Sequence, residues 1–317
     1  MNTKILKLLN EIYPLQITEI EVITNELYRC KADKGQFYAR ITNYKSFDEQ
    51  IDEIRYTKFL YENGISVPAV VPSLRHNLLE TITLDKAYLT VMYETAPGVH
   101  LQRKEWNSFI LRELGRQIGK LHRVSRQYEQ AFPENHINHW YDNEEYAFLK
   151  YIPEKEKKIR EKAAQLLNEI KGLPRGVMNY GLLHGDLCLE NVLVDKDSNI
   201  TMIDFQDCEK HFYIFDLAVT IYSAMEYSFT GNENITDYGR SIAAAIIIGY
   251  QEQHHLSQEM IDKLPLFIRL KEMFEYSLMH MYWNQDTLSE EQVRIMNHFR
   301  IKIENNHTLL NLSEMYI

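Results

Sequence analysis

Residues 183–207 read Leu-His-Gly-Asp-Leu-Cys-Leu-Glu-Asn-Val-Leu-Val-Asp-Lys-Asp-Ser-Asn-Ile-Thr-Met-Ile-Asp-Phe-Gln-Asp. This segment contains Asp186 and Asn191, and Asp204 follows a polar turn over residues 195–199. The apolar runs on either side of the turn predict a β-hairpin. Because an antiparallel hairpin brings its two ends together, we expect Asn191 and Asp204 to lie at one place, close to Asp186.

These oxygen-bearing side chains suit phosphoryl transfer from a nucleotide. The reaction requires a divalent cation on the phosphates, an oriented acceptor hydroxyl and a destination for the hydroxyl proton. A carboxylate on a rigid loop, such as Asp186, can supply the last two. Mg²⁺ binds a few protein oxygens together with phosphate and water oxygens, and Asn191 and Asp204 can provide them. Isolated polar loop residues are more often caps and turns, but the hairpin context favours the catalytic interpretation.

The first 95 residues predict a small, strand-rich lobe. Short runs of β-branched and aromatic residues alternate with turn residues. One stretch with apolar residues at helical spacing ends at Asn63-Gly64. The expected strands cover residues 17–24, 26–32, 36–42, 78–83 and 88–94, and the expected helix covers residues 47–62. We therefore expect a five-stranded sheet with one helix.

After Ala96-Pro97-Gly98 the pattern becomes helical. The expected helices cover residues 106–125, 154–171, 214–229, 237–254, 257–283 and 289–306. The sequence thus predicts an α+β protein with two lobes. A small antiparallel β-sheet lobe comprises residues 1–95, and a larger, mainly helical lobe comprises residues 96–317.

The motifs of this segment resemble the catalytic core of the aminoglycoside phosphotransferase and choline kinase superfamily. The protein-kinase pattern H-R-D-x-x-x-x-N followed by D-F-G corresponds to His184-Gly185-Asp186 to Asn191, followed by Asp204-Phe205-Gln206. Glycine in the middle of the first motif and a residue other than glycine after Asp-Phe are typical of the small-molecule branch of this protein-kinase-like fold. The resemblance implies a kinase that uses ATP and Mg²⁺ to phosphorylate a hydroxyl of an aminoglycoside, amino alcohol, amino acid or sugar.

The resemblance also implies a role for each motif residue. Asp186 becomes the catalytic base, or at least the group that orients the acceptor hydroxyl. Asn191 and Asp204 become ligands of Mg²⁺. His184 is expected to brace the catalytic loop by hydrogen bonding. Asp216 resembles the family's structural Asp at the head of the next helix, although a plain N-cap explains it equally well.

On the nucleotide side, the family pairs a cation on the third strand with a carboxylate on the helix that follows. Arg40 occupies the strand position here, and its fork of donors can bridge phosphate and carboxylate. Glu53 has the spacing expected of the partner, with Glu49 as the second choice. The resemblance therefore assigns Arg40 and Glu53 to the nucleotide site.

Two further segments are assigned to the nucleotide by the same resemblance. Met92, Tyr93 and Glu94 form the expected hinge, where backbone groups would bind adenine, although Met92 can equally be a core residue. The phosphate-covering loop, residues 21–27, departs from the family because it lacks glycine. Thr24 and Asn25 at its tip can still offer hydroxyl, amide and backbone donors.

The acceptor is expected in front of Asp186, against the C-terminal helices. Glu272, Glu275 and Tyr276 fall on neighbouring faces of one expected helix and suit a cationic amine. Core packing with a solvated edge explains them as well. Two alternatives share the scaffold: a protein Ser/Thr kinase, which the short segment between Phe205 and Phe215 disfavours, and a non-catalytic nucleotide-binding pseudokinase.

Bulk composition limits the partners. The formal charge of −10 disfavours nucleic-acid binding, and no apolar run is long enough for a membrane span. The three cysteines show no zinc-like spacing. Without a signal-peptide pattern, they indicate a reducing cytoplasm. We therefore expect a cytoplasmic enzyme whose partner is a small-molecule substrate.

Overall fold

The computed structural model describes residues 2–226 and 235–306. It contains an antiparallel sheet and a larger helical part, so the expected α+β class is confirmed. The chain separates into two compact units. Unit one comprises Met1–Leu101, Gln127–Ile137 and Asn191–Cys208, and unit two comprises Gln102–Arg126, Asn138–Glu190 and Glu209–Ile317. The lobe boundaries at residues 95 and 96 stay a prediction.

Unit one is built on an antiparallel sheet of six strands. They are β1 (Ile17–Val22), β2 (Leu27–Ala32), β3 (Gly35–Thr42), β4 (Val70–Val71), β5 (Glu80–Thr83) and β6 (Ala87–Glu94). The order is β1-β2-β3-β6-β4, and β5 also pairs with β6. The five expected strands are present, and the sixth, β4, is only two residues long.

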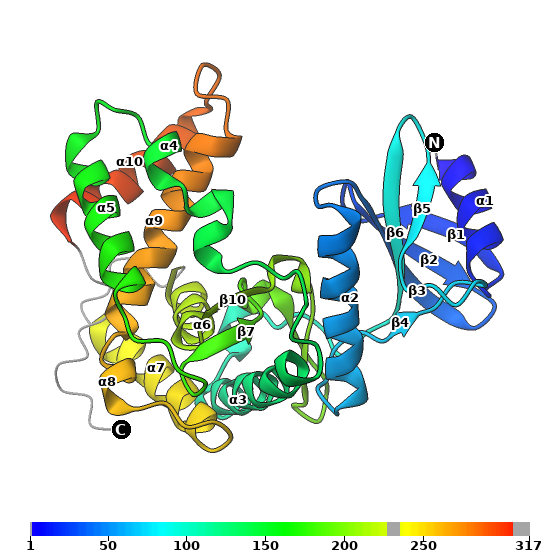
Figure 1. Ribbon diagram of the computed structural model, residues 1–317, viewed down its shortest axis with the longest axis horizontal. Coiled ribbons are helices and arrows are strands. Elements are labelled where there is room, and N and C mark those ends of the chain that lie inside the picture. Colours follow the sequence, from blue (N-terminus) through cyan, green and yellow to red (C-terminus); the bar gives the residue numbers. More distant parts are fainter. Residues whose placement is uncertain (1, 227–234, 307–317) are drawn as a thin grey trace. The chain divides into compact units, whose positions relative to one another are not determined.

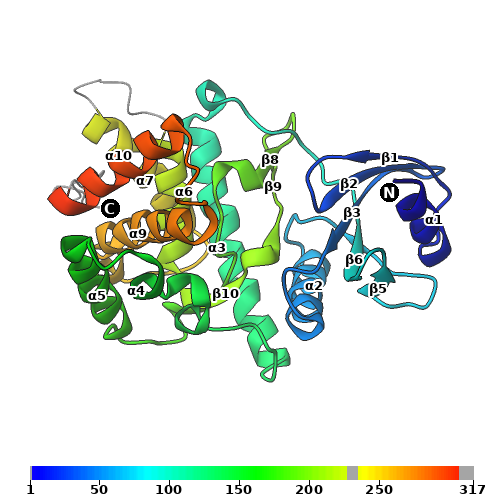
Figure 2. The same cartoon turned by 90° about the horizontal axis from the view of Figure 1, so that it is seen from above.

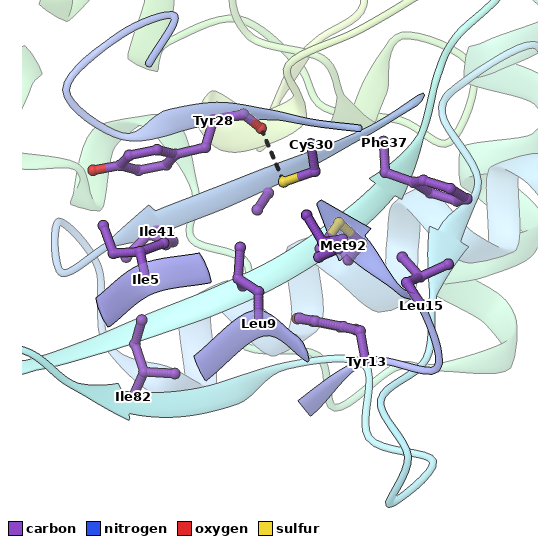
Figure 3. Close-up of a cluster of buried hydrophobic side chains, with 12 residues drawn as sticks. Ile5, Leu9, Tyr13, Leu15, Tyr28, Cys30, Phe37, Ile41, Ile82 and Met92 are labelled. Carbon is purple, nitrogen blue, oxygen red and sulfur yellow. Dashed lines mark hydrogen bonds between the residues drawn. The ribbon is translucent and has the colours of Figure 1, made fainter. Parts of the chain in front are cut away.

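A helix that the sequence analysis did not predict, α1 (Asn2–Ile12), precedes the sheet. Its apolar residues Ile5 and Leu9 are fully buried and point towards sheet residues such as Ile41 and Met92 (Figures 1 and 3). The helix closes one face of the sheet, which would otherwise expose apolar side chains to water. The expectation of one helix in this region was therefore wrong.

The other face of the sheet receives α2 (Phe47–Glu62), whose bounds match the expected helix. Ser46 caps it, and Glu49 completes the capping box. Because strand residues alternate between faces, β3 directs Ala39 and Ile41 into the core on the α1 side. Arg40 therefore points towards α2.

Unit one also contains the predicted hairpin, formed by β8 (Val192–Val194) and β9 (Ile200–Met202). Val194 exchanges two backbone hydrogen bonds with Val99, at 2.9 and 3.0 Å. Gly98 precedes this bridge with φ of 103°, and a Cβ added there would lie 2.9 Å from the backbone of Val194. Glycine is needed here for both its conformation and its small size.

Unit two is mainly helical, with a two-stranded sheet of β7 (Tyr180–Leu183) and β10 (Glu209–Phe212). Helix α9 packs against α4, α5, α6 and α10 (Figures 1 and 2). The helices are α3 (Ser108–Ala131, whose last residues belong to unit one), α4 (Phe148–Tyr151), α5 (Lys157–Lys171), α6 (Ile214–Glu226), α7 (Ile235–Gln251), α8 (Gln258–Ile261), α9 (Leu264–Tyr282) and α10 (Glu290–Asn305). Within the described residues, no helix could cross a membrane.

The expected helix over residues 257–283 is divided into α8 and α9. Pro265 lies in the first turn of α9, where its missing N–H costs nothing, whereas inside a helix it would break the hydrogen-bond ladder. The last residues of the expected helix 214–229 lie outside the described residues.

Candidate active site

The predicted catalytic loop of unit two, residues 184–190, follows directly from β7. Gly185 has φ of 89°, which only glycine adopts readily. The backbone N–H groups of His184 and Gly185 both donate to the carboxylate of Asp216, each at 3.0 Å. Asp216 is the third residue of α6 and is fully buried. It therefore braces the loop that presents Asp186, and the N-cap alternative for Asp216 is wrong.

Asp216 is itself held by a buried network. The Nε2 of His122 lies 2.9 Å from an Asp216 oxygen, and the Nδ1 of His122 lies 2.8 Å from the hydroxyl of Tyr250. None of these side chains is exposed. Burial of a charged group is tolerated when it is fully hydrogen-bonded, so the loop rests on a fixed polar support.

Helix α6 holds the loop at two further points. The hydroxyl of Thr220 donates to the carbonyl of Leu187 at 2.7 Å, and the Ser223 hydroxyl accepts the N–H of Leu189 at 3.0 Å. Asp216, Thr220 and Ser223 lie on one face of α6 by helical spacing. The sequence analysis missed Thr220 and Ser223, although polar residues at that spacing in an otherwise apolar helix were a readable signal.

Asp186 faces a lysine that the sequence analysis did not predict. Its Oδ1 lies 3.1 Å from the Nζ of Lys271 on α9, and its Oδ2 lies 3.9 Å from the Sγ of Cys188. Burial raises the pKa of Asp186, but the ammonium of Lys271 outweighs it, so this pKa lies below the usual value. Asp186 is therefore ionised at neutral pH.

In unit one, the hairpin brings Asn191 and Asp204 to the same end, as predicted. Val192 pairs with Met202, and the carbonyl of Asn191 accepts the N–H of Ile203 at 3.0 Å. Asp204 is exposed and adopts a left-handed conformation with φ of 64°. A residue other than glycine rarely occupies this region, and such strain is concentrated at functional sites.

The predicted ion pair of the nucleotide side is also present in unit one. Arg40 makes two hydrogen bonds of 2.8 Å to the two carboxylate oxygens of Glu53. Burial opposes the charge on Arg40, but the attraction of Glu53 outweighs it and the pKa of Arg40 is raised, with a smaller contribution from Asp204. Glu49 is occupied by the cap of α2, so Glu53 is the partner.

The remaining predicted residues have ordinary structural surroundings. Thr24 and Asn25 are exposed at the β1–β2 turn, where the Thr24 hydroxyl accepts the N–H of Leu27 at 3.0 Å. Met92 is a fully buried core residue, which leaves only its backbone for a nucleotide. Glu94 is exposed and Tyr93 is half-buried at the end of β6.

The predicted amine site on α9 is only partly available. Glu272 is buried with Lys302 at 2.8 Å, and Tyr276 is buried and donates to Glu156 at 2.6 Å. Both contacts join segments of unit two, which favours the core-packing alternative for these two residues. Glu275 is different, because its side chain is 33% exposed and lies 2.7 Å from the Nζ of Lys271.

Comparison with known proteins identifies the family. The model of the APH family, described as the phosphotransferase enzyme family, matches residues 16–255. The chain belongs to this family. A curated relative, the amicoumacin kinase of Bacillus subtilis (strain 168), is 30% identical over 285 residues, which cover 89% of this chain and 84% of the relative.

Solved structures of phosphotransferases share the fold. The amicoumacin kinase hAmiN in complex with AMP-PNP, Ca²⁺ and Ami superimposes with a TM-score of 0.89 at 26% identity, covering 97% of this chain and 94% of hAmiN. The microcompartment-associated aminopropanol kinase gives a TM-score of 0.69 at 21% identity, covering 95% of each chain. The kinase-like fold expected from the sequence is therefore confirmed.

Family membership confirms the expected reaction class. The chain is an ATP-dependent phosphotransferase that acts on a hydroxyl of a small molecule. ATP and a divalent metal ion are its cofactors. The oxygen donors at the hairpin end, Asn191 and Asp204, fit such an ion chemically, because hard divalent cations prefer amide and carboxylate oxygens.

Proposed function

We propose that this phosphotransferase uses Mg²⁺ and ATP to phosphorylate a hydroxyl of a small, amine-bearing compound, with amicoumacin as the first candidate. The observation that carries the proposal is the 30% identity to an amicoumacin kinase over 285 residues. The similarity to hAmiN over 97% of this chain supports the same substrate.

In this proposal Asp186 orients the acceptor hydroxyl and receives its proton. The brace from Asp216 to the two N–H groups of the loop supports this role, because it fixes the backbone that carries Asp186. A pre-oriented carboxylate lowers the barrier by avoiding the entropy loss of alignment during the reaction. The ionised state of Asp186 leaves its oxygens free of protons for the incoming hydroxyl.

In this proposal, residues of unit one bind the nucleotide. Asn191 and Asp204 would hold Mg²⁺, which neutralises charge that develops on the transferred phosphoryl group. Arg40, oriented by Glu53, would bind the phosphates, since a guanidinium can serve a carboxylate and a phosphate at once. Thr24 and Asn25 would cover the phosphates, and the backbone of Met92, Tyr93 and Glu94 would bind adenine.

The acceptor's amine would bind Glu275. Both Glu275 and Asp186 lie within hydrogen-bonding distance of the same Lys271 nitrogen, so the two carboxylates are neighbours. Each is about one-third exposed. An acceptor that carries an ammonium near its hydroxyl could therefore contact both groups.

The test is a measurement of ADP release by the purified full chain with Mg²⁺, ATP and a panel of acceptors. The panel contains amicoumacin, aminopropanol, an aminoglycoside and a serine-containing peptide, and mass spectrometry identifies any phosphorylated product. We expect the highest kcat/KM for amicoumacin and lower values for the others. Turnover of aminopropanol alone would overturn the amicoumacin assignment, and turnover of the peptide alone would overturn the small-molecule acceptor.

A further inference from the structure

A buried lysine from a distant part of the chain contacts the catalytic loop. Lys271 lies on α9, 85 residues after Asp186, and its side chain is only 9% exposed. Its ammonium lies 3.1 Å from Asp186 and 2.7 Å from Glu275, one helical turn further along α9. One buried cation therefore joins two carboxylates whose side chains remain partly open to solvent.

The surroundings of Lys271 are arranged to keep it charged. Burial disfavours the ammonium, but the charges of Glu275 and Asp186 outweigh it and the pKa of Lys271 is raised. The ring of Phe274 adds a cation–π contact, 5.5 Å from Nζ to the ring centroid. The charged or titratable groups that face Asp186 in unit two are Lys271, His184 and the thiol of Cys188.

A second buried lysine in the same unit offers a comparison. Lys302 pairs with Glu272 at 2.8 Å, and both side chains are almost completely buried, at 9% and 5% exposure. This ion pair joins α10 to α9 and lines a cavity between α5, α9 and α10. Lys271 is equally buried, yet its partner Asp186 is 34% exposed. Lys302 therefore joins two helices, whereas Lys271 joins a helix to the loop that carries Asp186.

A cation beside Asp186 has a clear chemical use in phosphoryl transfer. The carboxylate that orients the hydroxyl must approach a phosphoryl group that is also negatively charged, and two like charges repel one another. A buried ammonium on the protein side of the carboxylate offsets this repulsion without occupying the acceptor's place. It also restricts rotation of the carboxylate, because an ion pair in a low-dielectric site is strong.

We propose that Lys271, fixed by Glu275, is a positioning residue that holds the Asp186 carboxylate in its reactive orientation and offsets its charge. The proposal rests on Asp186 being the group that receives the acceptor hydroxyl. Lys271 acts through Asp186 and contributes nothing to nucleotide binding.

The experiment compares Lys271→Met, Lys271→Arg and the control Lys302→Met in the full chain, with kcat, acceptor KM and the Kd of ATP measured for each. Methionine is unbranched like lysine and only one atom shorter, and it removes the charge. We expect Lys271→Met to lower kcat about 100-fold, the scale of a small misplacement at a reacting centre, with the Kd of ATP unchanged. Lys271→Arg should recover part of kcat, and Lys302→Met should keep kcat while lowering the thermal midpoint.

A double-mutant cycle separates this proposal from the role of Asp186. In an Asp186→Asn background, Lys271→Met should cause no further loss, because the two residues act as one unit. Full turnover in Asp186→Asn would remove Asp186 from the reaction and the proposal with it. Loss of turnover in Asp186→Asn together with unchanged kcat in Lys271→Met would overturn the Lys271 proposal alone. Equal and additive losses in the cycle would also overturn it.

Discussion

The carboxylate of Asp216 accepts the backbone N–H of Gly185 at 3.0 Å, across 31 residues of sequence. The same carboxylate accepts the N–H of His184 and contacts Nε2 of His122. Through these contacts, Asp216 fixes the loop that carries Asp186 to helix α6. The relationship explains why an aspartate lies fully buried in the first turn of the largely apolar α6.

We expect Asp216→Asn to lower both kcat and stability. The amide has one acceptor oxygen in place of two, so one backbone N–H of the loop loses its partner, at a cost of about 1–3 kcal/mol. The measurements are kcat and the free energy of unfolding in urea. The matched control is Asp195→Asn, the same change at an exposed turn carboxylate that also accepts two backbone N–H groups. That control should keep kcat, and an Asp216→Asn enzyme with normal kcat would contradict the bracing role.

Local pattern was sufficient to predict the parts of the site that are near in sequence. The turn at 195–199 and its apolar flanks predicted the hairpin that joins Asn191 to Asp204. Capping signals and helical spacing predicted α2 to the residue. The Arg40–Glu53 pair was predicted from the family resemblance and the spacing of Glu53 on its helix, and the structure contains it.

Long-range relationships could not be predicted in the same way. The contact between Lys271 and Asp186 depends on how α9 packs in unit two, and no local pattern encodes it. The pairing of Glu272 with Lys302, which favours core packing over a substrate contact, is likewise long-range. Helix α1 was not predicted, although Ile5, Leu9 and Ile12 have the spacing of one helical face.

We expect Asp186→Ala to abolish turnover while the Kd of ATP stays close to that of the wild type. The proposed nucleotide contacts belong to other residues, so removing this carboxylate affects only the acceptor hydroxyl. Isothermal titration with a non-hydrolysable ATP analogue and Mg²⁺, beside a turnover assay, measures both effects. Unchanged turnover would remove Asp186 from the mechanism.

Asp204→Ala should instead weaken binding of the Mg²⁺–ATP complex. Asp204 is exposed at the hairpin end, so alanine removes the proposed metal ligand without opening a core cavity. The measurement is the Kd of ATP at several Mg²⁺ concentrations. The wild-type Kd should fall as Mg²⁺ rises, and the variant should lose most of this dependence. Equal affinity and equal Mg²⁺ dependence would rule out a metal role.

Glu53→Gln should weaken both nucleotide binding and the fold of unit one. The change leaves the buried Arg40 charge without a full countercharge, and breaking a buried pair in this way costs about 3–5 kcal/mol. Glu49→Gln is the matched control on the same helix, because glutamine also completes a capping box. We expect a higher Kd of ATP and a lower thermal midpoint for Glu53→Gln only. Similar behaviour of the two variants would contradict the assignment of Glu53.

We expect the buried His254 of unit two to make the stability of the protein depend on pH. Burial, followed by the nearby His122, lowers the pKa of His254 from 6.5 to about 4. Between these values the unfolded chain binds a proton that the folded chain does not, so stability is lost as the pH falls from 6.5 towards 4. The full shift corresponds to roughly 3 kcal/mol, and this loss is complete only when the pH is below both pKa values.

His254→Phe tests this assignment, because it keeps a ring beside Tyr213 and Tyr250 but removes the titrating group. Urea unfolding at pH 7.5, 6.5, 5.5 and 4.5 should show a smaller loss of stability with acidity in the variant than in the wild type. The exposed His100 supplies the control, and His100→Phe should follow the wild-type curve. If His254→Phe and the wild type lose stability in parallel over this range, His254 does not cause the loss of stability in acid. Another buried histidine of the unit, His211, whose pKa is also lowered by burial, is then the next variant to measure.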